Sequence, residues 1–142
     1  MSKKAVRRKK AKGVKLKTSR GLPVMAVLRC ADNSGAKKLR LIGVIGYKGR
    51  KGRLPSASVG DLVSVSVIDG KPDLVHTVQK AVIIRQKMPF RRPDGTVVSF
   101  EDNAAILVTA EVTPRGTEIK GPVAKEAVDR WPEISSICSI VV

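Results

Sequence analysis

The side chains best placed to do chemistry in this sequence are the cations of one glycine-rich loop. Residues 46–53 read Gly-Tyr-Lys-Gly-Arg-Lys-Gly-Arg, so four cations lie on a flexible backbone that can approach phosphates closely. The loop lacks the Lys-Ser/Thr pair and the following helix of a P-loop, and it does not fit the dinucleotide fingerprint. With the cations just before it, the loop forms a basic set without an acid between Asp32 and Asp61: Lys37, Lys38, Arg40, Lys48, Arg50, Lys51 and Arg53. A neutral surface loop usually mixes signs, so the pattern favours contact with RNA or DNA.

A second cationic cluster surrounds Phe90 on a predicted β-ribbon. The turn sequence Pro-Asp-Gly-Thr at 93–96 indicates a hairpin between residues 85–92 and 97–100. Its cations are Arg85, Lys87, Arg91 and Arg92. Such a hairpin can reach into a nucleic-acid groove, where arginines make bidentate phosphate contacts; the alternative is a hairpin that charge keeps soluble. Few aromatic side chains lie near these cations, which favours recognition of backbone and shape over base stacking.

No arrangement of side chains predicts a catalytic or metal centre. His76 is the single histidine, and Cys30 and Cys138 are too far apart in the sequence for zinc-ligand spacing. Each cysteine is most simply a small packed residue. Glu101 and Asp102 are adjacent, and adjacent side chains on a strand point to opposite faces, so we predict a turn here rather than paired catalytic carboxylates. We therefore expect a protein that is not an enzyme and that uses no cofactor and no metal.

The positive charge is graded along the chain. The net charge is +16, from 28 Lys and Arg against 12 Asp and Glu. Residues 1–20 hold ten basic residues, Lys9 and Lys10 among them, and no acid, whereas residues 101–142 hold four basic and seven acidic residues. Since a block of like charge does not collapse on itself, we expect 1–21 to be a basic arm, disordered when free, that binds nucleic acid by releasing counterions. A solubility tail or an import signal is the alternative, and a membrane surface fits less well because the arm has no apolar face.

Short strands must position these side chains. Apolar segments broken by Gly, Pro, Asn and Asp predict strands at 24–28, 39–45, 62–68, 78–85 and 104–108. In the third of them, alternation predicts that the valines face the core: Val63, Val65 and Val67. Strands this short at this spacing favour a small closed barrel, which leaves no exposed sheet edges.

The last forty residues have a different character. Gly-Pro at 121–122 predicts a helix that continues over 123–130 and ends before Pro132, with Val123, Ala127 and Val128 as its apolar stripe. Trp131 is either a core residue or an anchor for a partner. The predicted fold is therefore all-β with small α additions, in which 22–142 form a single barrel domain with a C-terminal helical segment.

Composition also bounds the cellular setting. The apolar runs are too short for a transmembrane helix, two cysteines cannot make a disulfide framework, and no secretory signal pattern opens the chain. We expect a reduced, cytoplasmic protein.

A series of short motifs follows in a fixed order between residues 22 and 142. Its signature part reads Ala81-Val82-Ile83-Ile84, a nine-residue spacer, Asp94-Gly95, and then Phe100, Asn103 and Ile106-Leu107. Further motifs are Cys-Ala-Asp-Asn-Ser-Gly-Ala at 30–36, Arg-Arg-Pro-Asp-Gly at 91–95, Phe-Glu-Asp-Asn-Ala at 100–104 and Gly-Pro-Val-Ala-Lys-Glu at 121–126. The series resembles the L-fourteen family of large-subunit ribosomal proteins, with Ile106 in place of the usual valine. The Phe-Glu-Asp-Asn form and Trp131-Pro132 resemble the archaeal and eukaryotic branch, and the Arg-Arg-Pro-Asp-Gly-Thr form leans archaeal.

The resemblance implies a fold, a function and a set of partners. The family fold is a closed five-stranded barrel with a protruding β-ribbon and small C-terminal helices. Family members bind large-subunit rRNA and help to form intersubunit bridges to small-subunit rRNA. The implied neighbours are ribosomal protein three and the L-twenty-four-e type protein. The family's C-terminal face also receives anti-association factors, and here that face would come from the segment 124–137 and from Thr117, Glu118, Lys125, Arg130 and Trp131. Glu118 replaces a basic residue of bacterial members.

Two functional hypotheses follow from these observations. The leading one is a structural constituent of the large ribosomal subunit that holds rRNA through its basic loop, ribbon and arm. The second is a free-standing binder of single-stranded nucleic acid built on an OB-like barrel, for which the usual aromatic platform is missing.

Overall fold

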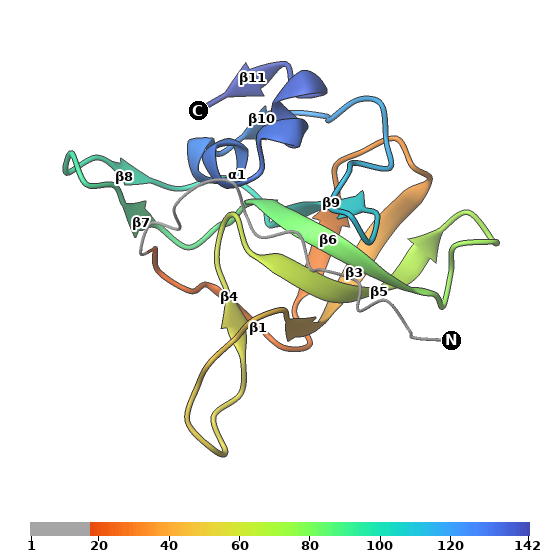
Figure 1. Ribbon diagram of the computed structural model, residues 1–142, viewed down its shortest axis with the longest axis horizontal. Coiled ribbons are helices and arrows are strands. Elements are labelled where there is room, and N and C mark those ends of the chain that lie inside the picture. Colours follow the sequence, from red (N-terminus) through yellow and green to blue (C-terminus); the bar gives the residue numbers. More distant parts are fainter. Residues whose placement is uncertain (1–17) are drawn as a thin grey trace, which may run out of the picture.

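The computed structural model describes residues 18–142, and most of its elements are short strands (Figure 1). The strands are β1 (Leu22–Pro23), β2 (Val27–Cys30), β3 (Ala36–Val44), β4 (Ser56–Ala57), β5 (Leu62–Gly70), β6 (Val78–Arg85), β7 (Phe90–Arg91), β8 (Val97–Val98), β9 (Ala104–Val108), β10 (Pro122–Val123) and β11 (Ile140–Val141). Two short helices, α1 (Lys125–Arg130) and the 3-10 helix η1 (Pro132–Ser136), precede the last strand. Neither helix within 18–142 has the length and apolar character that crossing a membrane requires.

Five strands close into a barrel in the order β2, β3, β5, β6 and β9, which confirms the predicted closed barrel. Neighbouring strands are antiparallel except β2 and β9, which pair in parallel and complete the closure. The bounds of β6 and β9 coincide with the predicted strands 78–85 and 104–108. Every second residue of β5 is buried as far as Val67, and Val63, Val65 and Val67 are completely so, as their alternation predicted.

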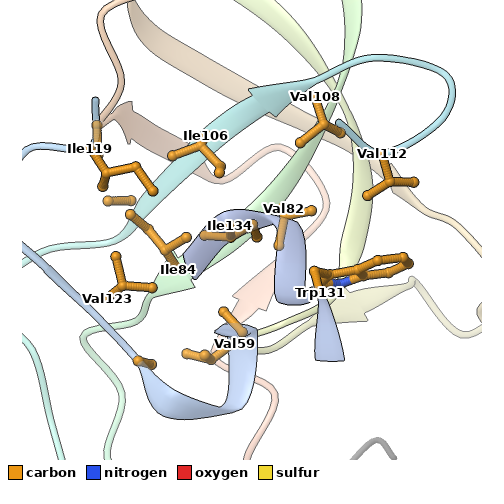
Figure 2. Packing of buried hydrophobic residues seen from close by; sticks show 14 of the residues in the cluster. Val59, Val82, Ile84, Ile106, Val108, Val112, Ile119, Val123, Trp131 and Ile134 are labelled. Carbon is orange, nitrogen blue, oxygen red and sulfur yellow. The ribbon is translucent and has the colours of Figure 1, made fainter. Parts of the chain in front are cut away.

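Two apolar cores lie on opposite sides of the same strands. One fills the barrel and includes Leu39, Val65 and Ile83. The other lies outside the barrel, where β6 and β9 are covered by the C-terminal segment (Figure 2). Because β6 is covered on both faces, Ile84 points into the outer core while its neighbour Ile83 points into the barrel. This arrangement explains why β9 and residues 81–84 of β6 are apolar on both faces.

The C-terminal segment differs from the predicted helix over 123–130. Pro122 and Val123 form β10, a parallel pair with β11, and α1 begins only at Lys125. The extended backbone is favoured here because Ala124 N–H donates to the carbonyl of Ile84 and so ties the segment to β6. Trp131 takes the core alternative: it is 5% exposed and its indole N–H donates to the carbonyl of Gly60 at 2.9 Å.

The first predicted strand, 24–28, is also wrong in its bounds. Val24 and Met25 form a turn, and Met25 adopts a φ of 76°. The turn separates β1, which pairs with β4, from β2, which enters the barrel. It is held by the amide of Ala26, which donates to the carbonyl of Pro23, and by the amide of Met25, which donates to the carbonyl of Leu41. The predicted ribbon is present as β7 and β8, with shorter arms than expected.

Candidate nucleic-acid interface

The glycine-rich loop projects from the barrel between β3 and β4, where Figure 1 shows it extending away from the rest of the chain. Its four cations are all exposed: Lys48, Arg50, Lys51 and Arg53. Gly46 and Gly52, near its two ends, have φ of 79° and 80°, which side chains with a Cβ rarely adopt. The loop therefore brings four unburied positive charges to the end of a backbone turned by glycine.

Arg20 contacts this loop, although its place in the sequence is at the end of the predicted basic arm. Its guanidinium lies 5.1 Å from the centroid of the Tyr47 ring, a cation–π contact. The ring is also close to Gly49, where a Cβ would lie only 2.4 Å from a ring carbon. Tyr47 thus packs within the loop, and its contact with Arg20 joins the segment before β1 to the loop. The sequence feature that could have indicated this contact is an aromatic residue between glycines and cations.

The buried side-chain amide of Gln86 also holds the segment before β1. Gln86 is 0% exposed; its Nε2 donates to the carbonyls of Ser19 at 2.9 Å and Met88 at 3.0 Å. Its Oε1 accepts from the amide of Val59 at 3.1 Å. All three contacts compensate for burying a polar group. The predicted RNA-binding residues Lys9 and Lys10 lie outside the described residues.

The strand cations lie on the barrel surface. Lys37, Lys38 and Arg40 of β3 are exposed, and Lys38 stands directly opposite Arg29 of β2. Arg29 is not among the predicted RNA-binding residues, although its side chain is 72% exposed. The signal that could have found it was the alternation of Val27, Leu28, Arg29 and Cys30, which places Arg29 on the outer face.

The ribbon cations divide into two kinds. Lys87 and Arg91 are exposed. Arg92 instead donates through Nε to Glu126 of α1 at 2.8 Å and through Nη2 to the backbone carbonyl of Val142. Its side chain is 18% exposed and that of Glu126 only 8%, so this ion pair ties the ribbon to the C-terminal segment.

Arg85 also has intramolecular partners. Its side chain is 7% exposed, and Nε donates to Asp102 at 2.9 Å. Nη1 donates to the backbone carbonyls of Lys120 at 2.9 Å and Pro122 at 3.0 Å. The guanidinium therefore joins β6 to the loop before β9 and to β10. Its role in RNA binding stays a prediction, while its contacts show a role in holding the fold together.

The predicted protein-facing residues also divide into exposed residues and residues that are bonded within the chain. Thr117, Glu118 and Lys125 are exposed, and Thr117 is held by Asn33 through two hydrogen bonds of 2.8 Å. Arg130 donates to Asp61 at 2.8 Å and to the carbonyl of Gly60 at 3.0 Å. Its guanidinium also lies 5.4 Å from the centroid of the Trp131 ring. Arg130 and Trp131 thus hold α1 against the loop before β5.

The cysteine and carboxylate side chains that could take part in catalysis or metal binding do not form such a site in residues 18–142. Cys30 is buried, and burial together with its hydrogen bond to Asp32 raises its pKa to about 12, so its thiol stays protonated and unreactive at neutral pH. In the ribbon turn, the backbone amide of Thr96 lowers the pKa of Asp94. Over residues 18–142, no group of three His, Cys, Asp or Glu side chains could hold a metal ion.

Comparison with known proteins agrees with the motif resemblance. Residues 21–142 match the family described as ribosomal protein L14p/L23e. Large ribosomal subunit protein uL14 of Thermoplasma acidophilum is 53% identical over 131 residues, which cover 92% of this chain and 99% of that protein. Its namesake from Thermoplasma volcanium is 54% identical over 131 residues, with the same coverage. That of Sulfurisphaera tokodaii is 53% identical over 122 residues, covering 86% of this chain and 88% of that protein.

Proposed function

The chain belongs to the ribosomal protein L14p/L23e family, whose members are structural proteins rather than enzymes, and on this premise we propose that it binds large-subunit rRNA through its basic loop. As a constituent of the large ribosomal subunit it works in the cytoplasm, as the sequence analysis expected. The observation that carries the rRNA proposal is the loop at 46–53, with four exposed cations, no acid and a projecting backbone. Nucleic-acid phosphates suit this loop because each Lys or Arg that contacts a phosphate releases a counterion condensed there, and this release favours binding.

The exposed cations of β3 and the ribbon extend this surface. Lys37, Lys38, Arg40, Lys87 and Arg91 have their charged ends available to phosphates. The guanidinium groups of Arg85 and Arg92 are bonded within the chain. These two residues would therefore support RNA binding mainly by holding in place the ribbon that carries Lys87 and Arg91.

The proposal includes a place at the subunit interface, with a bridge to small-subunit rRNA. Its partners would be ribosomal protein three, the L-twenty-four-e type protein and an anti-association factor at the C-terminal face. The family membership supports these assignments, as does the lower charge of that end, with seven acids against four bases over 101–142. The exposed Thr117, Glu118 and Lys125 are the residues through which that face would meet protein.

The competing function is a free-standing binder of single-stranded nucleic acid, which the closed five-stranded barrel favours. Such binders stack bases on exposed aromatic side chains. Here Phe90 and Trp131 are buried, Phe100 is partly buried and packs against the outer core, and Tyr47 packs against Gly49 and Arg20. The aromatic positions therefore argue for backbone recognition in a ribonucleoprotein.

The loop is tested by removing its charges together. In the full-length chain, Lys48, Arg50, Lys51 and Arg53 are replaced by Ala, and affinity for an rRNA fragment is measured over a range of salt concentrations. The slope of log K against log salt should flatten by about 3, since each lost phosphate contact removes about 0.7 to 0.9. The control replaces Lys71, Arg115, Lys120 and Lys125, exposed cations outside the loop, and should keep a steeper slope than the loop variant. An unchanged slope in the loop variant would remove the electrostatic basis of the proposal.

A further inference from the structure

One face of the barrel is left uncovered by the rest of the described chain. On β2, β3 and β5, outward side chains alternate with buried ones such as Leu28, Leu41 and Val65. We call these outward residues the barrel wall: Val27, Arg29, Lys38, Arg40, Ile42, Ser64 and Ser66. The C-terminal segment instead covers β9 and the second half of β6, where Val82 and Ile84 lie in the second core.

Like charges meet directly on this wall. Arg29 pairs across the strands with Lys38, and Val27 pairs with Arg40. Like charges directly opposite each other destabilise a sheet, so the arrangement costs folding free energy in the isolated chain. Two acids lie nearby: Asp102 is 3.6 Å from Arg29, and Asp69 stands opposite Lys38 on β5. The carboxylate of Asp102 forms this ion pair with Arg29 while it is also bonded to Arg85 at 2.9 Å, so the two acids do not balance Arg29, Lys38 and Arg40, and the remaining positive charge points to an external anion.

The cations lie on the two sides of a low, uncharged strip. Ser66 pairs with Arg40 on one side, and Ser64 pairs with Lys80 of β6 on the other. Lys80 is exposed, whereas both serines are partly buried and have short side chains. The strip thus offers hydroxyl groups between Arg40 on one side and Lys80 on the other.

The wall also exposes aliphatic side chains. Val27 is 50% exposed and Ile42 is 45% exposed, and Met25 beside β2 is 63% exposed. Scattered exposed aliphatic residues are ordinary, but here they share one face of the barrel with the cations and the serine hydroxyls. None of the wall residues is aromatic, so the wall has no side chain on which an unpaired base could stack.

This combination fits the minor groove of double-helical RNA. In the A-form, that groove is wide and shallow and displays ribose 2′-hydroxyls between two phosphate backbones. We propose that the barrel wall binds an A-form RNA duplex across its minor groove, with Ser64 and Ser66 facing the riboses and the flanking cations facing the phosphates. The inference rests on the proposed rRNA function and adds to it a second surface, separate from the loop, with a preference for paired RNA.

The test compares two single-charge variants of the full-length chain. Ser66→Glu places a carboxylate in the middle of the strip, whereas Ser136→Glu makes the same change at an exposed residue of η1. Fluorescence anisotropy is measured with a short blunt RNA duplex, with one of its strands unpaired, and with the DNA duplex of the same sequence. Since like-charge contacts weaken binding strongly, Ser66→Glu should lower affinity for the RNA duplex by about tenfold or more, and Ser136→Glu by less than about twofold. The unchanged chain should prefer the RNA duplex over both other ligands.

A second pair of variants guards against misfolding at Ser66. Lys38→Gln with Arg40→Gln should reduce affinity for the RNA duplex more than Arg115→Gln with Lys125→Gln, which removes the same charge from exposed residues elsewhere. If both wall variants, folded by circular dichroism, bind the RNA duplex like their controls while the loop variant has lost affinity, the wall proposal is overturned and the proposed function stands. Equal binding of unpaired and paired RNA also overturns it. If the unchanged chain binds no RNA at all, the proposed function fails with it.

Discussion

Arginine serves two purposes in this molecule, and the partners of each guanidinium distinguish them. Arg85, Arg92 and Arg130 each donate to a carboxylate and to at least one backbone carbonyl. The planar guanidinium suits this use because its five N–H groups can serve several acceptors at once. Arg50 and Arg53, in contrast, are exposed on the loop. Net charge alone therefore overstates the charge that is free to meet a polyanion.

At Arg85 the structural role can be tested directly. Arg85→Met should lower the free energy of unfolding by about 2 to 4 kcal/mol, because Asp102 and the two carbonyls at 120 and 122 lose a common donor. Arg85→Lys should rescue only part of the loss, since an ammonium cannot reproduce the fork. Urea denaturation measures both. Arg91→Met, at an exposed residue of β7, should change stability by less than about 0.5 kcal/mol. If Arg85→Met unfolded at the urea concentration of the unchanged chain, the contacts of Arg85 would not stabilise the fold.

At the scale of elements, alternation and apolar runs predicted four of the five barrel strands, β3, β5, β6 and β9, but misplaced the bounds of β2. β5 alternates because one face is solvated, whereas β9 and residues 81–84 of β6 are uniformly apolar because both of their faces are covered. The predictions failed where a distant segment decides the local backbone. Pro122 and Val123 are extended because β11 lies beside them, although Gly-Pro is also a common helix start. The division of ribbon arginines into buried and exposed ones depends on Asp102 and Glu126, whose positions no local pattern indicates.

The ribbon and α1 are coupled through one ion pair, which gives a prediction at this scale. Glu126→Gln removes the charge that Arg92 meets at 2.8 Å in a largely buried position and should destabilise the chain by about 1 to 3 kcal/mol. Hydrogen exchange of the ribbon amides of Arg92 and Gly95, which donate to the carbonyls of Thr96 and Arg92, should accelerate in the variant.

The control for this pair is Asp129→Asn, which makes the same change of charge on an exposed residue of the same helix. It should leave ribbon exchange unchanged. Equal exchange in Glu126→Gln and Asp129→Asn would show that the ribbon is held by its own turn and by Phe90, which is 1% exposed, rather than by α1.

Over the whole molecule, positive and negative charge are concentrated in different regions. The loop, the barrel wall and the exposed ribbon residues carry cations, while the segment after residue 100 has more acids than bases. The two apolar cores connect these regions, because β6 and β9 contribute side chains both to the barrel core and to the outer core under the C-terminal segment. A protein built in this way can meet RNA with one side and protein with another, as a constituent of a ribonucleoprotein must.

The arrangement predicts where the protein is found in a cell. On a sucrose gradient that separates the ribosomal subunits, most of the protein in a lysate should sediment with the large subunit. The loop variant, with Lys48, Arg50, Lys51 and Arg53 replaced, should shift toward the free fractions, because its share of the counterion release is lost. The variant with Lys71, Arg115, Lys120 and Lys125 replaced should shift less, although it has lost the same charge. A protein found mainly in the free fractions, with or without its loop charges, would favour the single-strand binder, because such a protein needs no subunit to hold it.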